Sequence, residues 1–375
     1  MKFIPRKIEF PNPRTRAYEL LELIAICGEF PTDQLSRLSG GVSYKETLVT
    51  SLKKKGFIKT YYADGMRGLR LTSNAKKHLL EVAPDRFSFY LKDNAETNHV
   101  RSHPTRRERL CRIAEATVTM MNAGVKIFRD ERPIVFTPTV EEIYQVQSPA
   151  FYPSREIKDI GFMFDKAGST RAIGVVLTKN DILLAYNIGD SLIQKWGYKV
   201  EKRAKTVIEY ELTIRRMPQQ YNADSVKGLV LANSMALAAE ILKSGDQRQY
   251  FLLDDNFEHF YFVTNDKRGE MLLRLICDHE LGVELDELLT SDLYLADNGS
   301  LIDHDAIAGD GRYVLLAYKC DLRRIRNFDR ELSVQKKKGI IYCFDYQAEV
   351  IRPCCSDAVE FQTLDFQKTE RRFFS

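Results

Sequence analysis

Short hydroxyl side chains and lysines follow one another along residues 43–54, and these side chains could bind a polyanion. In a helix, the face opposite the apolar residues would carry Ser43, Lys45, Thr47, Thr50, Ser51 and Lys54. Hydroxyl groups can hydrogen-bond base edges, and ammonium groups neutralise phosphates. Arg67 and Arg70 follow at a glycine-containing turn. The eight residues predict a surface that contacts nucleic acid.

A second possible chemistry is metal-dependent DNA cleavage, which needs paired carboxylates and usually a lysine near the attacking water. Glu156 and Lys158 have this local spacing. Further carboxylates nearby are Glu141, Glu142, Asp159 and Asp165. Such a spacing arises by chance in any charged chain, and no Asp-bearing strand precedes it. A metal nuclease therefore stays an alternative, and we assign no catalytic residue.

Histidines and cysteines do not predict a metal site. His99 and His103 are four residues apart, but Pro104 follows at once and no third ligand is near. The segment around His304 lacks the spacing of a calcium loop, because Ile307 stands where an oxygen ligand is needed, and it predicts a surface turn. Seven cysteines without a C-x-x-C pair predict reduced, structural thiols. We expect neither metal nor cofactor.

Motifs of several enzyme classes are missing from the sequence. There is no G-x-x-x-x-G-K-[ST] phosphate loop and no G-x-S-x-G elbow. The six histidines do not form the cluster that a histidine-type relaxase needs. Nucleotide hydrolysis is not predicted, and catalysis is not required for the interpretation that the sequence favours.

Three helices are predicted to position the hydroxyl-rich face. The first covers residues 16–27 and ends at Gly28, and the second is short, with Thr32 as its N-cap. The third runs from a Ser43 cap to residue 55, before Gly56. We expect its apolar stripe to pack in the core, and the stripe consists of Tyr44, Leu48, Val49 and Leu52.

A hairpin and a closing helix are predicted next. Residues 57–62 and 69–72 have strand character, and residues 64–68 form the turn, with Arg67 at its tip. Alternation turns Leu69 and Leu71 inward and Arg70 outward. The helix over residues 74–82 is expected to turn its lysines outward.

This order of elements resembles the winged helix-turn-helix family of DNA-binding domains. The residues that carry the resemblance are LVTSLKKKGFI (48–58), the turn 65–68 and LRLTSNAKKHLL (69–80), and it covers about residues 16 to 82. It implies that the third helix enters the major groove of double-stranded DNA and that Arg67 contacts the minor groove or a phosphate. Winged helices also dock proteins or form dimers, and this alternative stays open.

Charge is distributed unevenly along the 375 residues. Residues 1–110 hold 21 Lys and Arg against 12 Asp and Glu, a net charge of +9, and the remaining residues hold 35 against 40, a net charge of −5. A basic module joined to a mildly acidic body is typical of a protein that attaches a polyanion-binding domain to another function.

The rest of the chain predicts an α/β body. We expect a DNA-binding domain over residues 1–95, a connector and helix over 96–125, and an α/β domain over 126–375, α+β overall, with a mixed sheet. A restriction-endonuclease-like fold is one form this domain could take. Arg106, Arg107 and Arg109 begin the connector helix, and they either extend the DNA-binding surface or form a solvated helix end.

The overall plan resembles the replication-relaxation family of bacterial plasmids and integrative conjugative elements, through the winged helix and the runs YPSREIK and STRAIGVVLT. The resemblance implies a sequence-specific accessory protein for replication, relaxation or conjugative transfer of mobile DNA. Its partners would be double-stranded DNA and other proteins of a DNA-processing complex.

Two alternatives and a location complete the expectations. One alternative is a winged-helix transcription regulator whose body senses a ligand or forms a homodimer, and the other is the metal-dependent nuclease. No apolar run approaches the roughly 20 residues of a membrane span, and the amino-terminal residues lack the apolar core of a secretory signal. We expect a cytoplasmic protein without membrane contact.

Overall fold

The computed structural model describes residues 9–137, 145–158, 160, 170–192, 196–244, 253, 256–296 and 299–374. It divides into two compact units. The amino-terminal unit comprises Met1–Val118 and Phe128–Glu131, and the carboxy-terminal unit comprises Thr119–Ile127 and Arg132–Ser375. Helices and strands occur in both units, which confirms the mixed α/β composition expected from the sequence.

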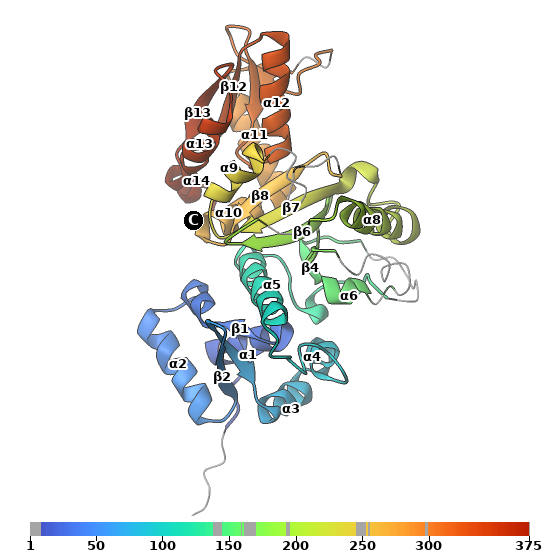
Figure 1. Cartoon of the computed structure of the whole chain (residues 1–375), viewed down its shortest axis with the longest axis vertical. Helices are drawn as coiled ribbons and strands as arrows, with labels where there is room; N and C mark the ends of the chain where they lie inside the picture. The colour runs from blue at the N-terminus through green and yellow to red at the C-terminus, as the bar shows by residue number, and fades with distance from the viewer. Residues whose placement is uncertain are drawn as a thin grey trace, which may run out of the picture. The chain divides into compact units, whose positions relative to one another are not determined.

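The amino-terminal unit combines helices with a small antiparallel sheet (Figure 1). Its elements are α1 (Arg16–Cys27), β1 (Phe30–Pro31), η1 (Thr32–Arg37), α2 (Val42–Lys54), β2 (Ile58–Ala63), β3 (Met66–Leu71), α3 (Ser73–Val82), α4 (Pro84–Leu91), the greater part of α5 (Pro104–Asn122) and η2 (Arg129–Glu131). The strand order is β1-β3-β2, so β3 is central.

Local sequence explains the ends of several of these elements. The Thr15 side chain accepts a hydrogen bond from the Tyr18 amide at the start of α1, and Gly28 ends this helix with a φ of 77°. The hairpin turn consists of Asp64 and Gly65, which both have positive φ, as a tight two-residue turn requires. The Thr72 side chain caps α3. The predicted helix 16–27, its Gly28 cap and the hairpin are confirmed.

Three local expectations are wrong, and one strand was not predicted. Tyr44 is 51% exposed, because the first turn of α2 is largely solvent-exposed, and only Val49 and Leu52 of the predicted stripe are fully buried. Helix α2 begins at Val42 after a Gly41 N-cap, so Ser43 lies inside the helix. The second helix is a 3-10 helix that already includes Thr32. Strand β1, which was not expected, pairs with β3.

The carboxy-terminal unit contains a five-stranded mixed sheet. Its strands, in spatial order, are β4 (Ala150–Pro153), β5 (Gly174–Leu177), β6 (Ile182–Gly189), β7 (Val226–Ala232) and β8 (Phe260–Thr264). The pairs β4-β5 and β5-β6 are antiparallel, whereas β6-β7 and β7-β8 are parallel. Strands β5, β6 and β8 are buried along their whole length, which is typical of a sheet covered on both faces.

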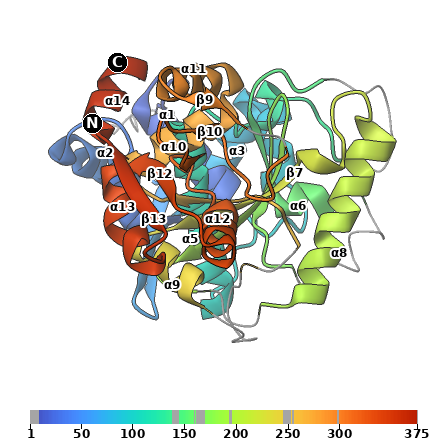
Figure 2. The ribbon, with the colours of Figure 1, turned by 90° about the horizontal axis from the view of Figure 1, so that it is seen from above.

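Helices connect and cover these strands. They are α6 (Ser154–Lys158), α8 (Tyr198–Glu209) with its π-helical continuation η3 (Tyr210–Arg216), η4 (Ala223–Ser225), α9 (Ala236–Lys243) and α10 (Lys267–Cys277). Within this unit, α8 lies on the side opposite α13 (Asp345–Ile351) and α14 (Phe366–Phe373) (Figure 2).

A second mixed sheet completes the carboxy-terminal unit. Its strands, in spatial order, are β13 (Val359–Leu364), β12 (Gly339–Phe344), β11 (Tyr313–Leu316), β10 (Ala306–Ile307) and β9 (Tyr294–Leu295). The helices α11 (His279–Thr290) and α12 (Leu322–Gln335) and the short η5 (Arg352–Cys354) accompany it. The Phe262 amide of β8 donates a 2.9 Å hydrogen bond to the Cys320 carbonyl, which joins the first sheet to the segment between β11 and α12.

In the part of the chain that the structure describes, no helix has both the length and the apolarity that crossing a bilayer demands.

Candidate nucleic-acid interface

Helix α2 presents the polar face that the sequence predicts. Its buried residues are Val49 and Leu52, and it packs against α1 and β2. Its solvent-exposed residues include Ser43, Thr47, Thr50, Ser51 and Lys54. The Thr47 hydroxyl donates to the Ser43 carbonyl at 2.8 Å, so its oxygen remains available as an acceptor. We call these five residues the α2 face.

Lys45 has a different position from the rest of the predicted set. Its side chain is half-buried, and its Nζ donates a 2.9 Å hydrogen bond to the Ser36 carbonyl of η1. This contact stabilises the packing of α2 against η1. Lys45 is therefore better placed to position the helix than to contact a ligand directly.

Arg67 lies at the exposed end of the β2-β3 hairpin. It is opposite Tyr62 in the register, only one pair away from the Asp64-Gly65 turn, and both side chains are exposed. The tyrosine ring is 70% exposed. A cation and an aromatic ring thus stand side by side at the hairpin end.

Arg70, in contrast, does not face solvent, and the expectation that it contacts a ligand is wrong. Its side chain is buried, and its Nη2 lies 2.6 Å from Oε2 of Glu29. Its guanidinium also lies 3.9 Å from the centre of the Tyr61 ring. Alternation failed as a guide because β3 is the central strand of its sheet and its last four residues, 68–71, are all buried.

Arg107 is the second partner of Glu29 and is fully buried. Its Nη2 lies 2.6 Å from Glu29 Oε1, and it donates further hydrogen bonds to the carbonyls of Ala63 and Met66, at 2.6 and 2.9 Å. These two carbonyls flank the hairpin turn. The side chain neither extends a DNA-binding surface nor forms a solvated helix end, which were the two expectations for it.

Glu29, Arg70 and Arg107 form a buried triad that holds the hairpin in place. The hydrogen bonds that Arg107 donates to the Glu29 carboxylate raise the pKa of Arg107 above its ordinary value. Gly68 leaves room for the carboxylate, since a Cβ there would lie 2.3 Å from Glu29 Oε1. Removing one member of such a buried ion cluster leaves an uncompensated charge. The triad therefore fixes the hairpin that presents Arg67.

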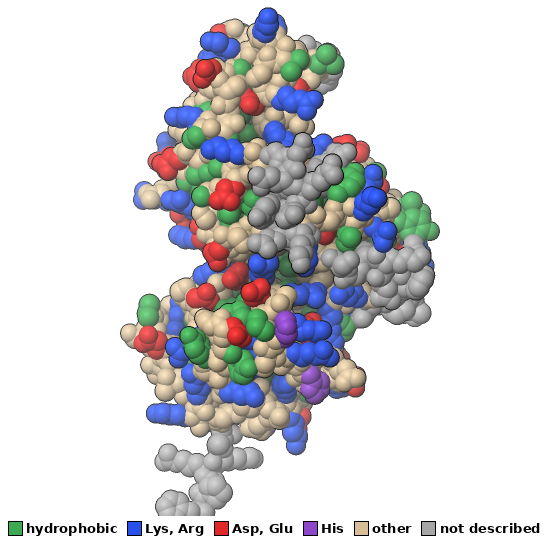
Figure 3. Space-filling view, in the orientation of Figure 1, with side chains coloured by type: hydrophobic (Ala, Val, Ile, Leu, Met, Phe, Trp, Pro, Cys, Tyr) green, Lys and Arg blue, Asp and Glu red, His purple; other side chains and the backbone are tan. Residues whose placement is uncertain are grey.

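Lysines surround the α2 face and the hairpin base. Lys54, Lys55 and Lys59 are exposed, and Lys53 is half-buried. Lysine and arginine side chains predominate at the end of this unit where α2, β2 and α3 meet (Figure 3). The positive charge that the sequence assigns to this part of the chain thus lies next to the hydroxyl-rich face.

The carboxylate pattern around Glu156 does not form an open metal site. Glu156 is buried in α6, and its Oε1 lies 2.6 Å from Nη2 of Arg132, whose guanidinium lies over the Tyr152 ring. The other carboxylates of the pattern, Glu141, Glu142, Asp159 and Asp165, lie outside the described residues. Among the residues that are described, no group of three or more His, Cys, Asp or Glu side chains could hold a metal ion.

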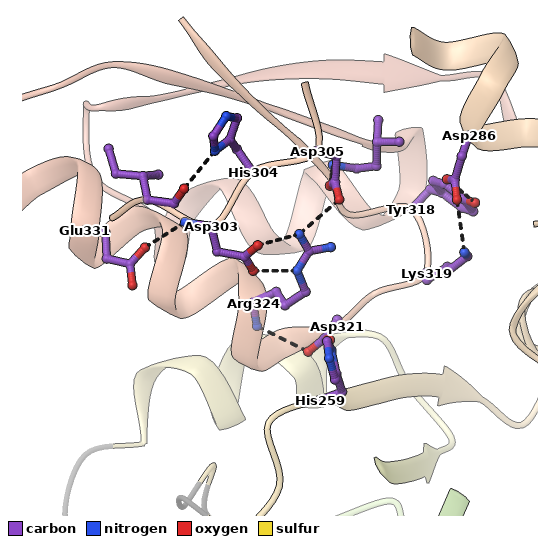
Figure 4. Close-up of polar contacts among 12 residues, drawn as sticks. His259, Asp286, Asp303, His304, Asp305, Tyr318, Lys319, Asp321, Arg324 and Glu331 are labelled. Atoms are coloured by element: carbon purple, nitrogen blue, oxygen red, sulfur yellow. Dashed lines mark hydrogen bonds and ion pairs between the residues drawn. The ribbon is translucent and has the colours of Figure 1, made fainter. Parts of the chain in front are cut away.

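The acidic segment around His304 surrounds an arginine (Figure 4). Asp303 receives two hydrogen bonds from Arg324, at 2.7 and 3.0 Å, and Asp305 receives one at 3.0 Å. Burial opposes the ionisation of Asp303, but the hydrogen bond and charge of Arg324 lower its pKa below the ordinary value. The expected surface turn is partly wrong, because the segment contains β10.

Asp321 organises the neighbouring junction between β8 and α12. Its Oδ1 accepts hydrogen bonds from the amides of Arg323 and Arg324 at the start of α12 and from the Phe260 amide. Its Oδ2 lies 2.7 Å from His259 Nδ1 (Figure 4). Asp321 thus caps α12 and joins it to β8.

No family model, curated protein or solved structure matches the chain. The family resemblance drawn from the sequence therefore stays a prediction. The buried triad was missed in the sequence. Its one local signal is the acidic Glu29 between Cys27-Gly28 and Phe30-Pro31, where an apolar residue would be expected.

Proposed function

We propose that the amino-terminal unit binds double-stranded DNA, with the α2 face in the major groove and Arg67 on the minor groove or a flanking phosphate. The observation that carries this proposal is the concentration of four hydroxyl side chains and Lys54 on the exposed side of a helix whose other side is buried. An α-helix fits the major groove, and hydroxyl groups can hydrogen-bond either donors or acceptors on base edges.

The order α1-β1-η1-α2-β2-β3 supports our assignment of a winged helix-turn-helix type of unit. In such a unit α2 is the recognition helix and the β2-β3 hairpin is the wing. Of the two arginines of the hairpin, we assign DNA contact to Arg67 only, because Arg70 is paired with Glu29. An arginine gains from the concentrated negative potential of a narrow minor groove.

The lysines around the α2 face would supply affinity. Each phosphate that is neutralised releases condensed counterions, so binding should weaken steeply as salt rises. The hydroxyl groups would add sequence preference, since they can reach base edges. Affinity and specificity would thus come from different residues of the same unit.

In the cell we propose a role as an accessory factor that binds plasmid or integrative-element DNA during replication, relaxation or transfer. The carboxy-terminal unit would serve assembly with other proteins. A transcription regulator with a dimerising or ligand-sensing body is the second candidate, because the same α2 face would serve a promoter equally well. The metal nuclease is less favoured, since Glu156 is buried against Arg132 and strands β5 and β6 carry no carboxylate.

Recovery of the DNA that is bound in the producing cell tests this proposal. Enrichment at an origin of transfer or replication supports the accessory factor, and enrichment at promoters supports the regulator. A variant with Lys54→Ala and Arg67→Ala is the binding-deficient comparison, and it should lose the enrichment while protein levels stay equal. Equal recovery by this variant, or no enrichment by the wild type, would contradict the proposal.

A further inference from the structure

Helix α8 and its π-helical continuation η3 form a continuous rod. Most of its acidic side chains lie on the buried side, and most of its basic side chains lie on the exposed side. The residues buried on its inner side are Glu201, Ala204, Val207, Ile208, Glu211 and Leu212. The exposed residues on its outer side include Tyr198, Lys199, Lys202, Arg203, Thr206, Tyr210, Ile214 and Arg215. Two of the three carboxylates of this rod are therefore hidden, and most of its cations are exposed.

The inward carboxylates have partners inside the unit. Glu201 accepts hydrogen bonds from the Thr170 hydroxyl at 2.6 Å and the Arg171 amide at 2.9 Å, and burial raises its pKa. Glu211 pairs with Arg216 at 2.9 Å and with Arg215 at 2.7 Å. These carboxylates stabilise the packing of the rod, and Glu211 also neutralises Arg215 on its outer face.

The outer face carries both cations and aromatic rings. Lys199 and Lys202 are exposed, and in the described part of the chain neither ammonium group pairs with a carboxylate. Tyr198 is 37% exposed and Tyr210 is 42% exposed. The Lys202 ammonium lies 5.6 Å from the centre of the Tyr198 ring. We call Tyr198, Lys199, Lys202 and Tyr210 the α8 face.

We propose that the α8 face is a second nucleic-acid surface, which binds the backbone of single-stranded DNA with its cations and stacks bases on its tyrosines. Cationic tracks with exposed aromatic rings are the combination that holds single strands without reading their sequence. Lysines three and four residues apart on one helix face lie at a spacing of roughly 5–6 Å, close to that of successive phosphates. The π-helical segment η3 adds a feature that is frequent at functional sites.

An anionic membrane fits this face less well. A helix that lies in a membrane interface must present an apolar face to the lipid, and the apolar side of α8, with Ala204, Val207 and Ile208, is already buried in the protein. Among the exposed residues of α8 and η3, only Ile214 is aliphatic. The charge pattern therefore favours a nucleic-acid strand.

Fluorescence anisotropy with labelled oligothymidylate tests the α8 face in the full chain. Lys199→Ala with Lys202→Ala should bind roughly tenfold more weakly at about 0.1 M salt, and the slope of log K against log salt should be smaller by about 1.4. Tyr198→Ala should also weaken binding, whereas Tyr198→Phe, which keeps the ring, should not. Lys337→Ala with Lys338→Ala removes the same charge from an exposed segment of this unit and is the matched control.

Three results would overturn the assignment. They are no binding of oligothymidylate by the wild type, an equal loss in the Lys337/Lys338 control, and binding of vesicles rich in anionic phospholipid without binding of oligothymidylate. The test is independent of the proposed duplex site. Lys54→Ala with Arg67→Ala should keep oligothymidylate binding while duplex binding falls, so failure of one surface can be told from failure of the other.

Discussion

Helices α2 and α8 both bury one side and expose a polar side, but the exposed chemistry differs. The α2 face carries four hydroxyl side chains and one lysine, whereas the α8 face carries two lysines and two tyrosines. Hydroxyl groups can hydrogen-bond base edges, and ammonium groups neutralise phosphates. Under the proposed roles, exposed hydroxyl groups suit α2 to recognition of a sequence, and exposed lysines and tyrosines suit α8 to binding of a backbone.

The largest expected effect concerns the support of the wing. Arg107→Ala should lower the free energy of unfolding by about 3 to 5 kcal/mol, because it leaves the Glu29 and Arg70 charges buried with incomplete pairing. Urea denaturation measures the loss. The adjacent exposed Arg106 is the matched control, and Arg106→Ala should cost less than about 1 kcal/mol. Equal losses would show that the triad does not hold the hairpin.

The next test compares how variants of α2 and α8 change the preference of the protein for one duplex sequence over another. Thr50→Ala with Ser51→Ala should reduce discrimination between the preferred duplex and a random one by about 1 to 3 kcal/mol, because contacts to base edges are lost while the lysines remain. Competition binding with the two duplexes measures it. Thr206→Ala on α8 should leave discrimination unchanged. Loss of discrimination in Thr206→Ala, or none in the α2 variant, would reverse the roles of the two faces.

The hairpin turn offers a smaller test of how the wing is aimed. Gly65 has a φ of 74° and open space around its Cα, so Gly65→Ala should cost about 1 kcal/mol from backbone conformation alone. It should also weaken duplex binding, since Arg67 follows two residues later. Gly309 is equally open but has no positive φ, so Gly309→Ala should change neither quantity. Thermal unfolding and duplex titration would measure both variants, and equal behaviour would contradict the strain argument.

The smallest effect is expected at the partly exposed Arg324 cluster, which contrasts with the buried triad. The pKa of Asp303 is lowered, so its contribution to stability is present above its ordinary value near 3.8 and is lost as pH falls through the lower, folded value. Unfolding free energy should fall with decreasing pH in this range, and less steeply in Asp303→Asn. Parallel pH profiles for the two proteins would show that the pair contributes nothing.

The sequence predicts most of the helices and strands of the amino-terminal unit, but not its buried ion pairs. Periodicity and caps located α1, the hairpin and α3, since these signals are local. Exposure of Thr50, Ser51 and Lys54 also followed from helical spacing. Two-residue β1 gave no periodic signal. Arg107 sits in a basic run that resembles a solvated helix start, and its burial depends on Glu29, which lies 78 residues earlier.

In the carboxy-terminal unit, the sequence predicted an α/β domain with a mixed sheet, but not the order of its strands. The arrangement of strands depends on contacts between distant segments, and apolar runs alone do not encode it. The α8 face was not predicted either. Lysines and glutamates are interspersed in the sequence of α8 and η3. Only the fold shows that Glu201 and Glu211 turn inward while Lys199 and Lys202 turn outward.

A salt titration of duplex binding tests the central claim most directly. Fluorescence anisotropy of a labelled random-sequence duplex would compare the wild-type chain with the Lys54→Ala and Arg67→Ala double variant. We expect steep salt dependence for the wild type, and for the variant a binding at least about tenfold weaker at about 0.1 M salt with a slope smaller by about 1.8. Superimposable curves for the two proteins would contradict the account.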